Sequence, residues 1–165
     1  MILLTQRLKL RPFSVTDAQS YFELTRDADI QKYIPCVCPR SVNATKETIE
    51  QYRRDAMFNK DYYLLLEDNT THQMIGALFV MREFDERYQV CMFIGKNFRR
   101  RGYMVEAIEA FVSNISYGTR LDFVVDLDNN ASLATMHKLA QTQNITEYEC
   151  TGLYRGERCI FELIV

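Results

Sequence analysis

The chain has 165 residues, of which 47% are hydrophobic and 25% are charged, and its formal net charge at pH 7 is -2. This composition is typical of a soluble globular protein, and the length predicts one domain over residues 1–165. No apolar run approaches the ~20 residues that a membrane helix needs, and the apolar start is too short for a signal peptide. We therefore expect a cytoplasmic protein without a membrane partner. The slightly negative net charge argues against general affinity for nucleic acid.

The cysteines do not predict a disulfide framework or a metal site. Their number, five, is odd, and their spacings do not repeat. Cys36 and Cys38 are the only close pair, and no second group of Cys or His accompanies them at the spacing of metal ligands. We expect reduced thiols and no bound metal.

The first third of the chain predicts one strand and two helices. Alternation around Leu8 and Leu10 favours a strand over Leu3–Phe13. Ser14-Val15-Thr16-Asp17 resembles a capping box, so a helix should begin there. Its predicted inner face carries Val15, Ala18, Phe22 and Thr25. Residues 27–42 include two prolines and predict a loop, and the spacing of apolar residues then predicts a helix over Asn43–Asn59.

The rest of the chain predicts strands interrupted by two helices. The predicted strands are Tyr62–Glu67, Met74–Met81, Arg87–Phe98, Leu121–Leu127, Ile145–Leu153 and Cys159–Val165, and the helices follow the apolar stripe from Val105 to Ile115 and the segment Ala131–Ala140. This order predicts an α+β protein with a mixed sheet. Strands joined by a helical crossover should be parallel, and hairpin strands should be antiparallel.

The most informative segment runs from Phe98 to Ala107, between a predicted strand and an amphipathic helix. Free backbone amides and the positive end of the helix dipole point outward at such a place. Gly102 permits a close backbone approach, and the three arginines before it add positive charge. The corner is suited to a diphosphate. The alternative is that these arginines form a solvated charge run, because a short basic string is a weak motif by itself.

Three motifs in register resemble the GNAT acetyltransferase superfamily. Arg99-x-x-Gly102-x-Met104 is similar to its acyl-CoA signature [Q/R]-x-x-G-x-[G/A], although Met104 stands where the signature has a small residue. The opening Thr5–Phe13 and the segment Val125–Ser132, followed by Lys138-Leu139, resemble the branch that contains the RimJ/RimL ribosomal-protein acetyltransferases. The resemblance implies the GNAT fold, with a mixed sheet of about six or seven strands and about four helices.

The resemblance also implies a site for acetyl-CoA, with no metal. Backbone groups of Phe93 and Ile94 would bind the pantetheine arm, and Asn129 would bind near it. Ser132 would protonate the departing thiolate, since Met136 occupies the place where many relatives have a tyrosine. The pyrophosphate would lie against Arg99, Arg100, Arg101, Gly102, Tyr103 and Met104. We expect Met104 to weaken this site without abolishing it, because its flexible side chain can turn away.

The general base and the acceptor are less well indicated. Related proteins often carry Glu where Gln89 stands, so the alternatives are Glu67, Glu83 or a chain of water molecules. The expected acceptor is a primary amine, on a small molecule or at a protein N-terminus, and the expected assembly is a monomer or a homodimer. Acceptor choice should lie in residues 29–40, in the second helix and in the hairpin 148–158. Candidates there and nearby are Tyr33, Asp61, Tyr62, Tyr148 and Glu149.

Two other functions are compatible with the same residues. Gln89, Met104 and Met136 depart from the common pattern, which is compatible with an acyl-CoA-binding protein that does not catalyse transfer. A nucleic-acid or ribosome-binding module would use Arg99–Arg101 together with Arg53 and Arg54, and its binding would depend steeply on salt.

Overall fold

The computed structural model describes residues 1–150 and 158–165, with only the backbone of residues 147–150. Eight strands form one sheet in the order β1-β2-β3-β4-β5-β6-β8-β7. The strands are β1 (Leu3–Leu4), β2 (Leu8–Pro12), β3 (Tyr62–Asp68), β4 (Met74–Phe84), β5 (Arg87–Ile94), β6 (Arg120–Asp126), β7 (Ile145–Cys150) and β8 (Arg158–Ile164). The helices within the described residues are η1 (Val15–Asp17), α1 (Ala18–Thr25), α2 (Ala28–Tyr33), η2 (Pro35–Val37), α3 (Val42–Phe58), η3 (Lys96–Phe98), α4 (Tyr103–Val112) and α5 (Asn130–Leu139).

The predicted α+β class with a mixed sheet is confirmed, with eight strands instead of six or seven and five α-helices instead of four among the described residues. β5 and β6 are parallel, because α4 connects them, and the other strand pairs are antiparallel. None of the helices within these residues combines the length and apolarity needed to span a bilayer.

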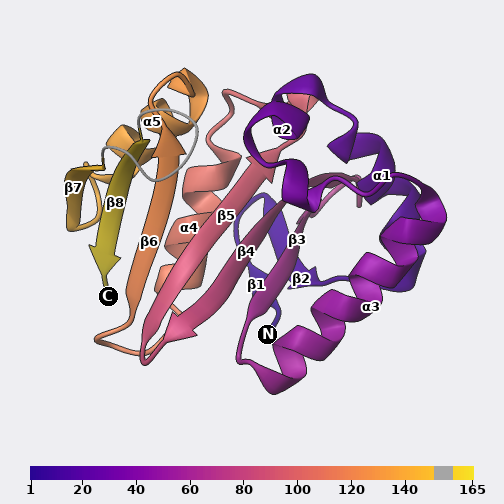
Figure 1. Ribbon diagram of the computed structural model, residues 1–165, viewed down its shortest axis with the longest axis horizontal. Helices are drawn as coiled ribbons and strands as arrows, with labels where there is room; N and C mark the ends of the chain where they lie inside the picture. The colour runs from indigo at the N-terminus through magenta and orange to yellow at the C-terminus, as the bar shows by residue number, and fades with distance from the viewer. Residues whose placement is uncertain (151–157) are drawn as a thin grey trace.

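The alternation of side chains along the strands supplies two cores, one on each face of the sheet. Leu64 and Leu66 of β3 pack toward α4 and α5, while Leu65 between them packs toward α1, α2 and α3. α4 contributes Ala107, Ile108 and Phe111 to the first core. Figure 1 shows α1 and α3 covering the part of the sheet around β2 and β3, and α4 visible between β5 and β6.

The pairing of β5 with β6 is incomplete, and this feature positions the site. The parallel register runs from Arg87 opposite Arg120 to Val90 opposite Phe123 and then stops. Cys91–Ile94 remain paired with β4, and the end of β6 remains paired with β8. Figure 1 shows the two ribbons together at one end and diverging toward the other, where α5 and α2 lie on either side.

Three predicted segments differ from the structure. The predicted loop over residues 27–42 contains α2 and η2, because Asp27 caps α2 by accepting from the amides of Asp29 and Ile30, and Ile30 is buried. The predicted first strand is divided in two, since Thr5 turns the chain through hydrogen bonds with Leu8. β5 ends at Ile94 and η3 follows it, so the strand does not reach Phe98.

Candidate active site

The open end of β5 presents the backbone on which the sequence places the pantetheine arm. Phe93 and Ile94 lie in the part of β5 that has no partner in β6. The Phe93 carbonyl oxygen lies so close to β4 that a Cβ added to Gly76 would be 2.2 Å from it. The glycine therefore allows the close approach of β4 and β5 at the opening.

The chain after β5 has the strand-to-helix geometry that the predicted anion corner requires. Arg100 and Gly102 have positive φ values of 62° and 79°, and Gly102 is the N-cap of α4. No side chain of the described residues caps this N-terminus, so the amides of the first turn and the helix dipole remain available to an anion. The first intrahelical bond is donated by the Glu106 amide to the Gly102 carbonyl at 3.1 Å.

Four cationic side chains surround or adjoin this corner. A Cβ on Gly102 would lie 3.7 Å from both Arg7 Nη2 and Lys138 Nζ. Arg7 is held by Glu106 and donates to the Arg101 carbonyl at 2.8 Å. Arg100 and Arg101 are exposed. Arg7 and Lys138 were not among the residues predicted for the site. The only signal for them in the sequence is that both lie in segments that resemble the family.

Arg99 differs from its two neighbours. Its Nη2 lies 2.5 Å from Asp27 Oδ1, its Nη1 lies 2.6 Å from Asp29 Oδ2, and its Nε donates to the Ile94 carbonyl at 3.0 Å. The guanidinium group is thus committed to protein partners, and its backbone is the part that borders the corner.

The Met104 side chain is turned away from the corner. It is 7% exposed and belongs to the core on the α4 side of the sheet. A longer residue is therefore accommodated where the family signature has a small one, because its bulk lies among core side chains.

The start of α5 brings the other two predicted residues to the end of β6. Asn129 is the N-cap, and its Oδ1 accepts from the Ser132 amide at 3.2 Å. Ser132 is half-buried, and its hydroxyl has no hydrogen-bond partner in the part of the chain that the structure describes. Met136 is fully buried in the core, so this side chain is structural.

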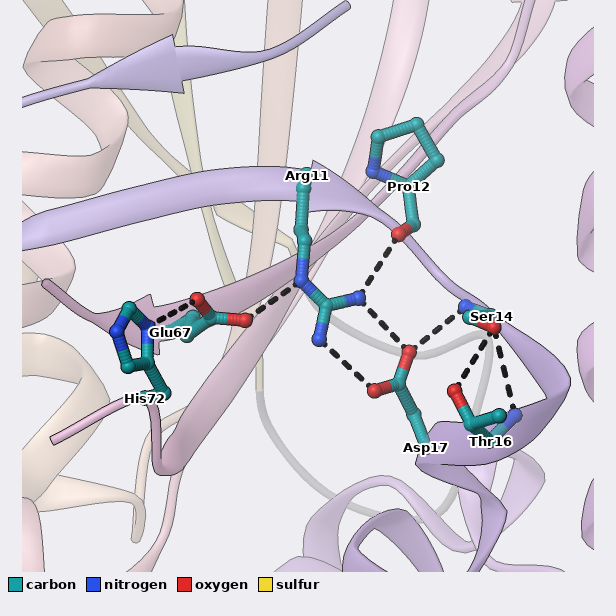
Figure 2. Close-up of polar contacts among 7 residues, drawn as sticks. All are labelled: Arg11, Pro12, Ser14, Thr16, Asp17, Glu67 and His72. Carbon is teal, nitrogen blue, oxygen red and sulfur yellow. Dashed lines mark hydrogen bonds and ion pairs between the residues drawn. The ribbon is translucent and has the colours of Figure 1, made fainter.

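Neither Glu67 nor Glu83 lies at the opening. Glu67 is on β3, two strands away from β5, and Figure 2 shows it between Arg11 and His72. Burial disfavours its charge, but the hydrogen bonds from Arg11 and His72 outweigh burial and lower its pKa below the usual value. Glu83 is exposed near the turn before β5, at the opposite end of that strand from the opening.

The Arg11 network in Figure 2 is structural. Arg11 also binds both carboxylate oxygens of Asp17 at 2.8 Å, and Asp17 in turn accepts from the Ser14 amide in the predicted capping box, which is confirmed. The network joins β2 and β3 to the start of α1.

A buried carboxylate beside Gln89 was missed by the sequence analysis. Asp122 lies opposite Gln89 in the parallel register and is 6% exposed. Its Oδ2 is 2.5 Å from Arg87 Nε, whereas its Oδ1 has no partner within the described residues. A charged residue inside the apolar run Leu121–Val125 was the available signal.

The thiols do not form a nucleophilic or metal site in the part of the chain that the structure describes. Burial raises the pKa of Cys91 to about 12, so this thiol is neutral at physiological pH. Cys36 is exposed and Cys38 is half-buried, and neither forms a disulfide within the described residues. The described residues contain no group of three or more His, Cys, Asp or Glu side chains that could hold a metal ion.

Of the acceptor candidates, Tyr33 lies at the end of α2 and donates to the Asp128 carbonyl, whereas Asp61 and Tyr62 have structural contacts. Asp61 is buried and accepts from the Arg82 amide at 2.8 Å, and Tyr62 packs edge-on against Phe111. The Tyr148 and Glu149 side chains and residues 151–157 lie outside what the structure describes.

The basic residues do not combine into one surface for nucleic acid. Arg53 pairs with Glu50 on α3, which covers the opposite face of the sheet from α4. Arg54 is likewise on α3 and donates to Gln51. Arg100 and Arg101 instead precede the N-terminus of α4, and Arg99 is paired with Asp27 and Asp29.

Comparison with known proteins gives a family and a fold. A model of the acetyltransferase (GNAT) domain matches residues 7–140. The chain is 25% identical over 150 residues to an uncharacterized N-acetyltransferase, YnaD of Bacillus subtilis, covering 90% of this chain and 78% of that protein.

Solved structures share the fold at low sequence identity. A putative ribosomal-protein-serine acetyltransferase from Vibrio cholerae is 19% identical, with a TM-score of 0.80 over 100% of this chain and 98% of that one. RimL, a ribosomal alpha-N-protein acetyltransferase solved in complex with coenzyme A, is 16% identical, with a TM-score of 0.84 over 100% and 98% of the two chains. These neighbours agree with the resemblance to the RimJ/RimL branch.

Proposed function

The chain belongs to the acetyltransferase (GNAT) family, and we propose that it transfers an acetyl group from acetyl-CoA directly to a primary amine. One observation carries the proposal: β5 and β6 part beside a helix N-terminus that has no side-chain cap. A diphosphate at the corner and a pantetheine arm along the unpaired end of β5 are the ligand groups that these two features suit.

Acetyl-CoA, when bound, supplies an activated acyl group as a thioester. The chain binds and orients it through the Phe93 and Ile94 backbone and through the amides between Arg99 and Met104. Arg100, Arg101, Arg7 and Lys138 add positive charge beside those amides. Charge-assisted contacts of this kind are stronger than neutral hydrogen bonds.

Ser132 and Asn129 have separate roles in the proposal. The Ser132 hydroxyl is free of protein partners within the described residues and half-buried, so it is available to give a proton to the departing thiolate. Asn129 uses Oδ1 for the helix cap, which leaves its amide group to donate to the pantetheine arm.

The proton of the amine requires another route. Glu67 and Glu83 lie away from the opening, and Gln89 cannot accept a proton. We assign this step to water molecules, because the exposed Gln89 side chain stands on the solvent side of β5. The acceptor is a small-molecule amine or a protein N-terminus. Because the structural neighbours include ribosomal-protein acetyltransferases, N-terminal peptides should be tested as acceptors.

A thermal-shift titration with acetyl-CoA, followed by a panel of small amines and N-terminal peptides, tests the proposal. We compare Gly102→Asp with Gly102→Asn, since both residues tolerate positive φ and have similar size but differ in charge. An aspartate beside Arg7 and Lys138 should pair with these cations and exclude a diphosphate, whereas asparagine should preserve part of the stabilisation by acetyl-CoA. Equal affinity in both variants and the wild type would remove the anion corner from the proposal.

A second candidate function is acyl-CoA binding without catalysis. It is favoured by the absence, within the described residues, of a carboxylate base at the open end of β5. Acetyl-CoA would then stabilise the protein, but no amine in the panel would become acetylated.

A further inference from the structure

α2 is linked to the loops that follow both of the diverging strands. On the β5 side, Asp27 and Asp29 bind Arg99 through separate nitrogens. Asp27 is also the N-cap of α2, so Arg99 holds the residue that begins the helix.

On the β6 side, the other end of α2 reaches the loop before α5. Lys32 Nζ lies 2.7 Å from Asp128 Oδ2, and the Tyr33 hydroxyl donates to the Asp128 carbonyl at 3.1 Å. Since β5 and β6 separate at this end, α2 forms a bridge over the opening between them.

The two attachments of this bridge are unequal. Lys32 and Asp128 are 56% and 63% exposed, and such surface pairs contribute little. Arg99 and Asp27 are 25% and 13% exposed, and Arg99 binds two carboxylates and the Ile94 carbonyl together. Ile30 is the only buried residue of α2, so the position of the helix depends strongly on Arg99.

We propose that Arg99 is a positioning residue for the acceptor side of the active site, where its guanidinium group fixes α2 across the opening instead of binding phosphate. The inference rests on the proposed function. The anion corner belongs to α4, whereas α2 packs on the opposite face of the sheet, in the core that includes Phe93. A thioester threaded through the opening would therefore meet its amine on the side that α2 borders.

Hydrogen exchange tests the structural step without any ligand. Arg99→Met should make the Gln31 and Ile34 amides, which bond within α2, exchange roughly tenfold faster while α3 is unchanged. Arg99→Lys should not restore the wild-type rate, because one ammonium group cannot reproduce a planar fork across two carboxylates. Arg53→Met, which removes an exposed pair on α3, is the control and should leave α2 unchanged.

Titration of the Asp29→Asn variant with coenzyme A separates positioning from phosphate binding. A phosphate-binding Arg99 would be released by Asp29→Asn, which would tighten coenzyme A binding, and Arg99→Lys would retain much of the affinity. Positioning predicts unchanged affinity in Asp29→Asn, while Arg100→Met weakens binding roughly threefold to tenfold. With an amine from the panel, Asp29→Asn should raise KM for the amine and leave KM for acetyl-CoA unchanged.

Unchanged α2 exchange in Arg99→Met, or tighter coenzyme A binding in Asp29→Asn, would overturn the inference. If Arg99→Met does not fold, Asp29→Asn carries the same exchange test, because it removes one of the two carboxylate contacts. A wild-type protein that fails to bind coenzyme A would refute the proposed function, whereas the exchange result would still decide whether Arg99 fixes α2.

Discussion

The contact between Gly76 and β5 allows a quantitative test of the opening. In Gly76→Ala the new Cβ would lie 2.2 Å from the Phe93 carbonyl oxygen and 3.1 Å from Ile94 Cα, where real Cβ contacts are essentially never shorter than 3.0 Å. The obstructing atoms belong to the backbone, so no side-chain rotation relieves the clash. β5 must move away from β4 along the segment proposed to bind the pantetheine arm.

Overpacking of this kind costs about 1–3 kcal/mol of unfolding free energy. For a chain of this size that corresponds to a decrease in Tm of roughly 2–12 °C. Because the displaced backbone is also a proposed ligand, we expect the affinity for acetyl-CoA to fall as well. The decrease in affinity should exceed the decrease seen in a control variant that loses stability without moving this backbone.

Gly95→Ala is the matched control. A Cβ there would meet Leu24 Cδ1 at 2.5 Å, which is the end of a flexible side chain, and the nearest backbone atom is 3.3 Å away. Calorimetric unfolding and acetyl-CoA titration of both variants provide the comparison. The reasoning is refuted if Gly76→Ala is as stable as the wild type, or if both variants bind acetyl-CoA equally well.

Four further predictions concern the chemistry and the pH dependence. Ser132→Ala should lower kcat, by up to the ~10²- to 10⁴-fold that a positioned acid contributes, with little change in acetyl-CoA affinity. If Ser132→Ala keeps full kcat while chemistry is rate-limiting, Ser132 has only a structural role. Asn129→Ala should weaken acetyl-CoA binding and lower the free energy of unfolding by about 1 kcal/mol through the lost helix cap. Cys36→Ser with Cys38→Ser should leave transfer intact, and mass spectrometry should find no acetylated cysteine during turnover; trapping one would contradict direct transfer. The lowered pKa of Glu67 stabilises the fold above the usual carboxyl value of 4.5, and this stability is lost as pH falls through the lower folded-state pKa. The difference in unfolding free energy between the wild type and Glu67→Gln should therefore narrow as pH is lowered below 4.5, and a constant difference would show that Glu67 does not carry this dependence.

Local signals predicted the elements that depend on neighbouring residues. The capping box at Ser14 and Asp17 was predicted from four residues and is confirmed by reciprocal hydrogen bonds. The alternating and helical spacings placed most strands and helices within a few residues, and the crossover by α4 required the parallel pairing of β5 and β6. α2 was missed because it is short and its stability comes from Asp27, Arg99 and a single buried side chain.

The sequence by itself determined the fold class and the family resemblance, and it predicted an anion corner at Gly102, since these follow from side-chain periodicity and from a motif contiguous in the chain. Only the tertiary structure decided what each charged side chain contacts. The sequence does not distinguish Arg99 from Arg100 and Arg101. In the fold, Asp27 and Asp29 pair with Arg99. Arg7 and Lys138 come instead to the N-terminus of α4. Electrostatic interactions depend on distance in space and on burial, and for partners about 70 residues or more apart neither quantity can be obtained from the sequence.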